Sequence, residues 1–255
     1  MECLTFRRDS RFYDVGRASD DEPMRVTPRL EKAFRTVRGC FSGSGRRIAR
    51  EVGCSRLTGV WIDVGACLGT ETFGAAKENP GLHVYAFEPN LRLAAQCWGL
   101  FPNIIVLPMA VAEKDGVADF YINANLGASS LLPFNPEGLR RWVGGELLKV
   151  QSKAMVPTIR LDTFMNRMRI SRVDYLKVDA QGADLAVIRS AGERLKDIRK
   201  IKLEVATTPV SLYEGAGRRS EVVDYLGRSG FTLASSEAQS CGQEENLTFI
   251  PRGEA

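Results

Sequence analysis

Two short stretches place residues suited to binding a nucleotide-like ligand at the ends of apolar runs. The run VWIDV (60–64) continues into GACLG, which gives the spacing Asp63-x-Gly65-x-x-x-Gly69. Glycines at such a turn let a ligand approach the backbone N–H groups. Glu88 ends the next apolar run, where a carboxylate can accept hydrogen bonds from both hydroxyls of a ribose. Together these stretches predict a site for a nucleoside-bearing cofactor, against the alternative of a purely structural turn.

The cofactor predicted from these residues carries adenosine but no pyrophosphate. The glycine spacing differs from the GxGxxG pattern of dinucleotide-binding turns, which counts against NAD. An adenosine cofactor that ends in an amino acid beside a sulfonium cation explains a ribose acid without a pyrophosphate-binding turn. Asp63 and Asp179 would supply negative charge near the ammonium and sulfonium groups. We therefore expect S-adenosylmethionine.

Strand-like runs that alternate with helical patterns must position these residues. The alternation begins at residue 59 and predicts βαβ units around a parallel sheet, whose carboxyl edge gathers the candidate residues. The last two strands, joined by a polar loop, are expected to form a closing antiparallel pair. The expected strands with their exit turns span residues 59–64, 83–89, 103–112, 116–123, 173–182, 200–206, 231–236 and 246–251, and the expected helices span residues 69–78, 91–100, 183–191 and 221–230.

Two regions depart from this alternation. Residues 1–58 are expected to form an N-terminal arm with a basic amphipathic helix over 28–37, and a solvated helix is favoured over a phosphate or nucleic-acid surface. Residues 59–255 form the main domain. Residues 124–157 interrupt it with a long irregular insertion rich in glycine and proline. We favour a lid or substrate wall for this insertion over a surface excursion.

Composition and charge narrow the class of protein. The 255 residues carry a formal net charge of +4, which is too small to indicate nucleic-acid binding by itself. Six cysteines without a CxxC pair, together with a single histidine, argue against a zinc site and a disulfide framework. We find no signal-type apolar stretch at the N-terminus and no apolar run long enough to span a bilayer. A cytoplasmic protein with no membrane span is expected.

Five motifs, which occur in the order seen in one family, give the chain a specific resemblance. The chain resembles the FkbM family of class I methyltransferases over about residues 59–250. The resemblance implies an α/β, Rossmann-like fold: a seven-stranded, mostly parallel sheet with helices on both faces and a C-terminal antiparallel strand pair. It also implies S-adenosylmethionine as methyl donor and O-methylation of a hydroxyl on a sugar, glycan or secondary metabolite. The motifs are WIDVGACLGTETF (61–73), VYAFEPN (84–90), GASSL (127–131), VPTIRLDTF (156–164) and DYLKVDAQGADLAVI (174–188).

The resemblance assigns roles to single residues. Ala110 and Val111 match the loop beside the adenine, and Asp179 matches the acid at the end of the fourth core strand, which faces the transferred methyl. Asp179 is also the expected catalytic group, because a positioned carboxylate can take or share the proton of an attacking hydroxyl. Orientation of the cofactor's amino group, or capping of the next helix, stays open for Asp179. The expected cofactor-binding residues are Asp63, Gly65, Ala66, Gly69, Thr70, Glu88, Pro89, Ala110, Val111 and Asp179.

The chain departs from the family's pattern at two sites. Cys67 stands where the family often has Asn, and we expect this position to act partly through its backbone. Gln181 and Asp184 stand where the family usually has Glu. This weakens any carboxylate cluster for a divalent metal, so no metal site is expected. Lys177 and Glu204, on neighbouring strands, are weaker catalytic candidates.

Three functions are consistent with these residues. A small-molecule or glycan O-methyltransferase is favoured. An RNA methyltransferase would use the same turn, with the basic segment 25–56 as its phosphate contact. The fourth strand, however, ends in DAQG and not in the NPPY-like motif that serves attack by a base nitrogen, so a nucleic-acid partner is not expected. The third function is a cofactor-binding domain without activity, which an assay for methylated product distinguishes from the first.

Overall fold

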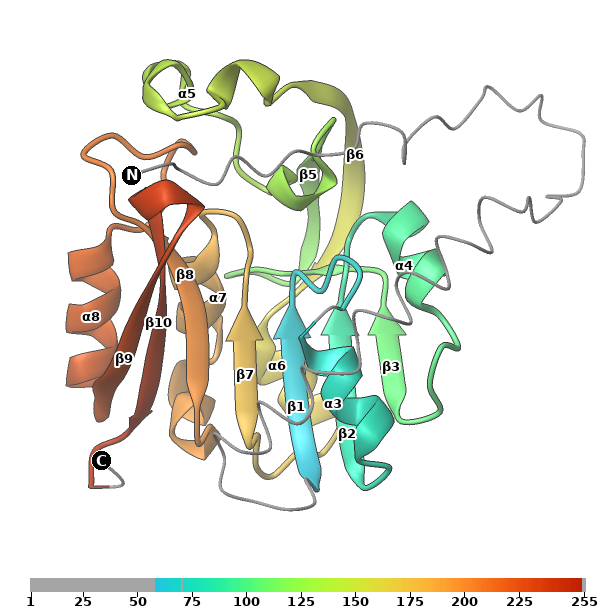
Figure 1. Cartoon of the computed structure of the whole chain (residues 1–255). Coiled ribbons are helices and arrows are strands. Elements are labelled where there is room, and N and C mark those ends of the chain that lie inside the picture. The colour runs from blue at the N-terminus through green and yellow to red at the C-terminus, as the bar shows by residue number, and fades with distance from the viewer. Residues whose placement is uncertain (1–57, 70, 254–255) are drawn as a thin grey trace, which may run out of the picture.

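A computed structural model describes residues 58–69 and 71–253. The expected N-terminal arm with its basic helix and the predicted cofactor residue Thr70 therefore lie outside the described residues. Within the described part, the chain builds one seven-stranded sheet and one three-stranded sheet (Figure 1).

The main sheet has the strand order β3-β2-β1-β7-β8-β10-β9. Neighbouring strands from β3 to β8 pair in parallel, whereas β10 runs antiparallel to both β8 and β9. This confirms the expected mostly parallel sheet with a C-terminal antiparallel pair. The strands are β1 (Gly59–Val64), β2 (Leu82–Phe87), β3 (Ile104–Leu107), β7 (Tyr175–Val178), β8 (Ile201–Ala206), β9 (Phe231–Gln239) and β10 (Glu244–Pro251).

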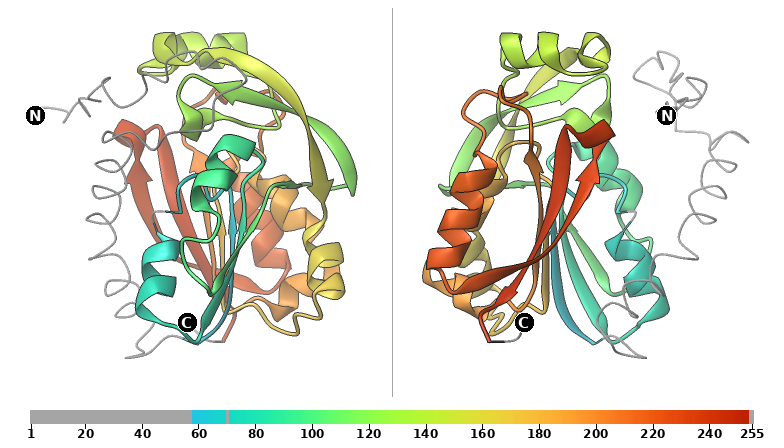
Figure 2. Two further views of the ribbon diagram at one scale, coloured as in Figure 1. Left: turned by 90° about the vertical axis from the view of Figure 1, so that its right-hand side faces the viewer. Right: turned by 60° about the vertical axis from the view of Figure 1, so that its left-hand side comes forward.

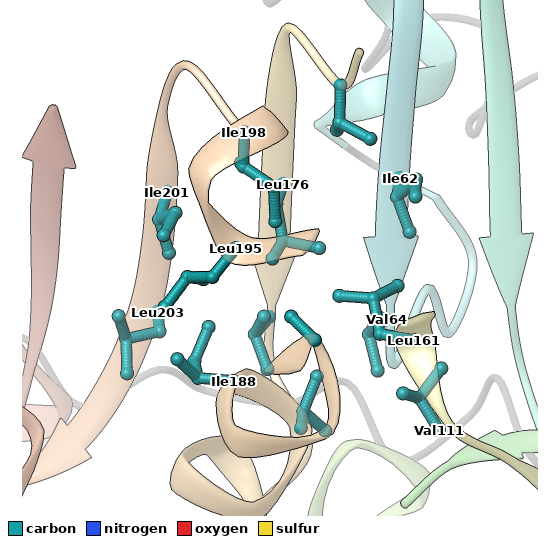
Figure 3. Close-up of a cluster of buried hydrophobic side chains, with 14 of the residues drawn as sticks. Ile62, Val64, Val111, Leu161, Leu176, Ile188, Leu195, Ile198, Ile201 and Leu203 are labelled. Atoms are coloured by element: carbon teal, nitrogen blue, oxygen red, sulfur yellow. The ribbon is translucent and has the colours of Figure 1, made fainter. Parts of the chain in front are cut away.

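Alternation of side chains along the strands gives the main sheet two buried faces. In β1, Ile62 and Val64 belong to one apolar cluster, and Trp61 belongs to the other. Figure 3 shows the first cluster, which contains strand residues such as Leu176 and Leu203 together with Ile188 of a covering helix. Each such side chain stabilises the fold by roughly 1.5–3 kcal/mol through burial.

Helices cover both faces of the main sheet, as expected, and Figure 2 shows the sheet between the two helical layers. Side chains of α6, α7 and α8 pack in the first cluster, and those of α3 and α4 pack in the second. The helices are α3 (Thr72–Glu78), α4 (Leu91–Cys97), α6 (Leu161–Arg167), α7 (Asp184–Ser190) and α8 (Arg219–Arg228), with the 3₁₀ turns η4 (Gly192–Asp197) and η5 (Ser240–Gly242).

The three-stranded sheet stands beyond the carboxyl ends of the parallel strands (Figure 1). Residues 150–157, which were expected to be irregular, belong to one of its strands and pair with residues 117–123. The expected strand 103–112 is also divided, because residues 110–111 pair with this second sheet. Its elements are β4 (Ala110–Val111), β5 (Gly116–Asn123), η2 (Leu126–Ala128), α5 (Pro136–Arg141), η3 (Gly145–Leu147) and β6 (Val150–Ile159).

The segment between β5 and β6 is fastened to the loop that follows β8. The backbone N–H of Asn135 donates to the carbonyl oxygen of Leu212 at 2.8 Å, and that of Glu214 donates to Pro133 at 2.9 Å. Between these bonds Phe134 stacks on the ring of Tyr213, with ring centroids 5.1 Å apart. The insertion is therefore a packed part of the domain, and its role as a lid remains a prediction.

Candidate active site

The turn after β1 needs glycine at Gly65. This residue has a φ of +76°, and a Cβ atom added there would overlap the backbone carbonyl oxygen of Asp179. The turn after β1 and the turn after β7 can approach each other this closely only because Gly65 has no side chain. Gly69 has a φ of +65°, and a Cβ atom there would overlap the ring of Phe73 at the start of α3.

Glu88 follows the last residue of β2 and is buried, with 5% of its surface exposed. Its two oxygens accept hydrogen bonds from backbone N–H groups: Oε2 from Cys67 and Oε1 from Asn90, each at 2.8 Å. Cys67 presents this N–H from a left-handed backbone conformation, with a φ of +50°. Burial raises the pKa of Glu88 to about 7. The carboxyl keeps unused lone pairs, which suit a pair of donating hydroxyls.

A first cavity, which we call the adenosine cavity, lies between the turn after β1, the end of β2 and the three-stranded sheet. Among the predicted cofactor residues, six line it, and apolar side chains such as Phe120 and Leu131 close its far wall. Apolar walls with a few polar groups are typical of pockets for small ligands. The six are Gly65, Glu88, Pro89, Ala110, Val111 and Asp179.

A second cavity, which we call the polar cavity, adjoins the first. Gly65, Cys67 and Asp179 line both cavities, so the two meet at the ends of β1 and β7. Most of the side chains that line the polar cavity are charged or carry an amide, whereas the adenosine cavity combines a few such groups with many apolar side chains. Its lining includes Asp63, Ala66, Glu71, Lys177, Lys202, Glu204, Gln239 and Asn246.

Asp63 lies in the polar cavity and is held by its neighbours. It is 1% exposed, accepts a hydrogen bond from the hydroxyl of Thr72 at 2.6 Å, and pairs with Nζ of Lys177 at 3.2 Å. Lys177 is its direct neighbour in β7 and also lies 3.6 Å from Oδ2 of Asp179. Although burial favours the neutral amine, Asp63, Asp179 and Glu71 raise the pKa of Lys177, which therefore stays charged. Asp63 thus holds the ammonium group of Lys177 next to Asp179.

Asp179 follows β7 at the boundary of the two cavities, and 39% of its side chain is exposed. Its Oδ1 accepts a hydrogen bond from Nε2 of Gln181 at 2.8 Å, and the same Nε2 lies 3.1 Å from Oε2 of Glu204 in β8. The hydroxyl of Tyr213 donates to Oε1 of Gln181 at 2.9 Å, and the hydroxyl of Ser130 donates to its backbone carbonyl at 2.7 Å. Gln181 therefore links two acids to the insertion.

The predicted residues are largely brought together. Gly69 lines neither cavity, and its role is to turn the chain into α3. Ala66 and Asp63 lie in the polar cavity, so they are near the junction and not beside the apolar adenosine walls. Among the described residues, no group of three or more His, Cys, Asp or Glu side chains could hold a metal ion.

Two residues of the site, Tyr213 and Ser130, are not predicted from the sequence. A third, Gln181, is noted there only as a departure from the family's pattern. Tyr213 lies outside every motif named above, and Ser130 lies in the motif GASSL (127–131) without a role assigned to it, since the partner of both, Gln181, is far away in the chain. Gln181 itself stood out only because the family usually has Glu there. The sequence signal that could have found it is its place two residues after Asp179, in the turn between a buried strand and a helix; in the structure this turn gives Gln181 a φ of +51°.

Comparisons with known proteins identify the family to which the chain belongs. The seven-stranded, mostly parallel sheet with its C-terminal antiparallel strand pair is that of a class I methyltransferase fold. A family model described as "Methyltransferase FkbM domain" matches residues 63–233. The chain belongs to this FkbM methyltransferase family, and its cofactor is S-adenosylmethionine. The part of the chain that the structure describes holds no helix of the length and apolarity that crossing a membrane requires.

Similar proteins include the 2-O-methyltransferase NoeI of Sinorhizobium fredii, which is 26% identical over 178 residues that cover 66% of this chain and 70% of the relative. Solved structures that align with the chain include magnesium protoporphyrin IX methyltransferase from Synechocystis PCC 6803, with 11% identity, a TM-score of 0.45, and coverage of 94% of this chain and 88% of that chain. Another is TrmK of M. capricolum, with 9% identity, a TM-score of 0.45, and coverage of 81% and 68%.

Proposed function

We propose that this methyltransferase transfers the methyl group of S-adenosylmethionine to a hydroxyl oxygen of a sugar, glycan or secondary metabolite. The observation that carries the proposal is the place of Asp179, a carboxylate that lines both the adenosine cavity and the polar cavity. A polar, hydroxyl-bearing acceptor suits the polar cavity because its walls offer carboxylate, amide and ammonium groups. The similarity to NoeI, a 2-O-methyltransferase, supports oxygen as the accepting atom.

The adenosine cavity suits the nucleoside part of the cofactor. The carboxylate of Glu88 would accept hydrogen bonds from the two ribose hydroxyls, and Ala110 and Val111 would pack beside the adenine. Gly65 would let the cofactor approach the backbone after β1. When bound, S-adenosylmethionine supplies a methyl group on a sulfonium sulfur, which makes that methyl electrophilic.

Asp179 would act on the acceptor at the junction of the cavities. An alcohol is a weak nucleophile while it keeps its proton, so a carboxylate that takes or shares this proton favours attack. Gln181 and Lys177 hold the two oxygens of Asp179 and so restrict its orientation. Much of the rate would come from holding the hydroxyl in line with the methyl group. The partner is thus a small-molecule or glycan hydroxyl compound.

Product analysis tests this proposal. The protein is incubated with S-adenosylmethionine that carries a ¹³C methyl group and with a panel of methyl glycosides, polyols and phenols, and unfractionated RNA is added as a separate arm. We expect a ¹³C-labelled methyl ether by NMR and mass spectrometry in at least one hydroxyl arm. Label on RNA, label on nitrogen or carbon alone, or no label in any arm would contradict O-methylation.

A further inference from the structure

We propose that Glu204 is a second acid–base group of the transfer site, paired with Asp179 through the amide of Gln181. The pair gives up a proton when the cationic methyl donor binds, and it takes up the acceptor's hydroxyl proton when the methyl group leaves. This inference rests on the proposed function and goes beyond it, because it adds a second carboxyl to the one already assigned.

The geometry joins the two carboxyls through one side chain. Nε2 of Gln181 lies 2.8 Å from Oδ1 of Asp179 and 3.1 Å from Oε2 of Glu204. Both acids line the polar cavity. Oε1 of the same amide accepts from the hydroxyl of Tyr213, so Nε2 is the end of the amide that faces both acids. In this orientation Gln181 acts as a positioning residue for the two carboxyls.

Glu204 is protonated in this setting, whereas Lys177 is a cation that lies next to Asp179. Burial first, and then neighbouring acids, raise the pKa of Glu204 well above its ordinary value, against a smaller opposing effect of Lys177. Acids face Glu204 from three other elements. Burial raises the pKa of Tyr213, so its hydroxyl keeps its proton and remains a donor. The acids are Asp179 after β7, Asp184 at the start of α7 and Glu244 in β10.

A cation bound where the two cavities meet changes the protonation of Glu204. A positive charge near a carboxyl favours its ionised form, so binding of a sulfonium beside Asp179 favours loss of the proton from Glu204. During transfer the O–CH₃ bond forms, the S–CH₃ bond breaks with its electron pair left on sulfur, and the hydroxyl proton passes to the carboxylate pair. The sulfonium charge disappears in the same step, which favours a protonated Glu204 again.

Calorimetry on the full-length protein tests the inference without an acceptor. S-adenosylmethionine and S-adenosylhomocysteine differ in the sulfonium charge, and binding of each is measured at pH 7.5 in two buffers of different ionisation enthalpy. The difference between buffers gives the number of protons released. We expect S-adenosylmethionine to release up to about one proton more than S-adenosylhomocysteine, and we expect Glu204→Gln to remove this difference. Protons released by Glu88 cancel, because both ligands carry the ribose.

Glu71→Gln is the matched control, because it makes the same chemical change in the same cavity. Although burial opposes its charge, Lys202 and Tyr175 hold the pKa of Glu71 below its ordinary value, so it has no proton to release. The control should keep the difference between the ligands. Equal proton release for both ligands in the unchanged protein, or an unchanged difference in Glu204→Gln, would overturn the inference.

Carbon NMR of the unchanged protein covers the case in which Glu204→Gln does not fold. With ¹³C-labelled glutamate carboxyls at pH 7.5, we expect one carboxyl to be protonated in the free protein and with S-adenosylhomocysteine, and ionised with S-adenosylmethionine. A spectrum without such a carboxyl overturns the inference. Failure of the proposed function looks different, since it appears as methyl transfer to another atom or as no transfer while the proton release is present.

Discussion

At the scale of single residues, the proposed function depends on two carboxylates whose surroundings differ. Glu88 is enclosed and bonded to two backbone N–H groups, whereas Asp179 is partly exposed where two cavities meet. The first arrangement favours tight recognition of paired hydroxyls, and the second leaves an acid free to meet an acceptor. Each therefore predicts its own response to pH or mutation.

Cofactor affinity should depend on the ionisation of Glu88. Its pKa is raised to about 7, so the carboxyl is mostly protonated at pH 6 and can no longer accept from both ribose hydroxyls. Affinity is thus present above this pKa and is lost as the pH falls through it. We expect the affinity for S-adenosylhomocysteine, measured by calorimetry, to be about tenfold weaker at pH 6 than at pH 8.

The variant Glu88→Gln, which keeps the size of the side chain, should bind more weakly at pH 8 and show no such pH dependence. Its far-UV circular dichroism should match that of the unchanged protein. If Glu88→Gln binds with unchanged affinity, the ribose is not recognised by this residue.

Removing the charge of Asp179 should slow methyl transfer. We expect Asp179→Asn to lower kcat about 10²-fold or more, because the amide cannot take the hydroxyl proton. Initial rates with saturating cofactor and acceptor provide the measurement. Asp119→Asn is the control, since Asp119 of β5 pairs with Lys153 of β6 on the surface of the three-stranded sheet. Near-normal turnover in Asp179→Asn would leave that residue only a positioning role.

At the scale of elements, the turns after β1 and β7 depend on each other. The backbone N–H of Asp179 donates to the carbonyl oxygen of Val64 at 2.9 Å, and Gly65 leaves room for the carbonyl oxygen of Asp179. A side chain at Gly65 would separate the two turns and so widen the junction between the cavities. This contact therefore serves both stability and cofactor binding.

Two alanine variants separate backbone strain from collision. Gly65 and Gly99 both have positive φ, but only at Gly65 would a Cβ atom meet another part of the backbone. We expect Gly99→Ala to lower the free energy of unfolding by about 1 kcal/mol and Gly65→Ala to lower it by about 3 kcal/mol or more. Urea unfolding measures both. Equal losses would show that the close approach of the two turns contributes nothing.

The insertion is coupled to the site through Tyr213. Its buried hydroxyl lies 3.0 Å from the carbonyl oxygen of Ala128 and 2.9 Å from Oε1 of Gln181, and its single proton can be donated to either, so Tyr213→Phe leaves both acceptors without this donor. We expect a loss of about 1–2 kcal/mol in the free energy of unfolding and a higher KM for the acceptor. Tyr225 lies on α8, and its ring packs beside Arg189 of α7. The variant Tyr225→Phe should change the free energy of unfolding by less than about 0.5 kcal/mol. A KM unchanged in Tyr213→Phe would argue against the coupling.

Local patterns made β1, β2 and the acid Glu88 predictable, because an apolar run followed by a turn residue is visible within a few positions. Strand β6 was missed, because its first half is largely exposed and shows no apolar alternation. The links of Gln181 to Ser130 and Tyr213 span 51 and 32 positions. Such contacts follow from the packing of the insertion against the sheet, which no local pattern records.

At the scale of the whole molecule, the order of strands gathers the site at one edge. The ends of β1, β2 and β7 lie side by side, and the three-stranded sheet closes the space beyond them (Figure 1). The adenosine cavity extends from Asp179 toward the end of β2, the polar cavity includes residues of β8 and β10, and the two share Gly65, Cys67 and Asp179. We therefore propose that donor and acceptor occupy different cavities and meet at one carboxylate.

A crystal structure of the protein with S-adenosylhomocysteine tests this central claim most directly. The account predicts both ribose hydroxyls within hydrogen-bond distance of the Glu88 carboxylate, the adenine beside Ala110 and Val111, and the sulfur near Asp179 and directed at the polar cavity. A ribose that contacts neither oxygen of Glu88, or a sulfur that faces away from the polar cavity, would contradict it.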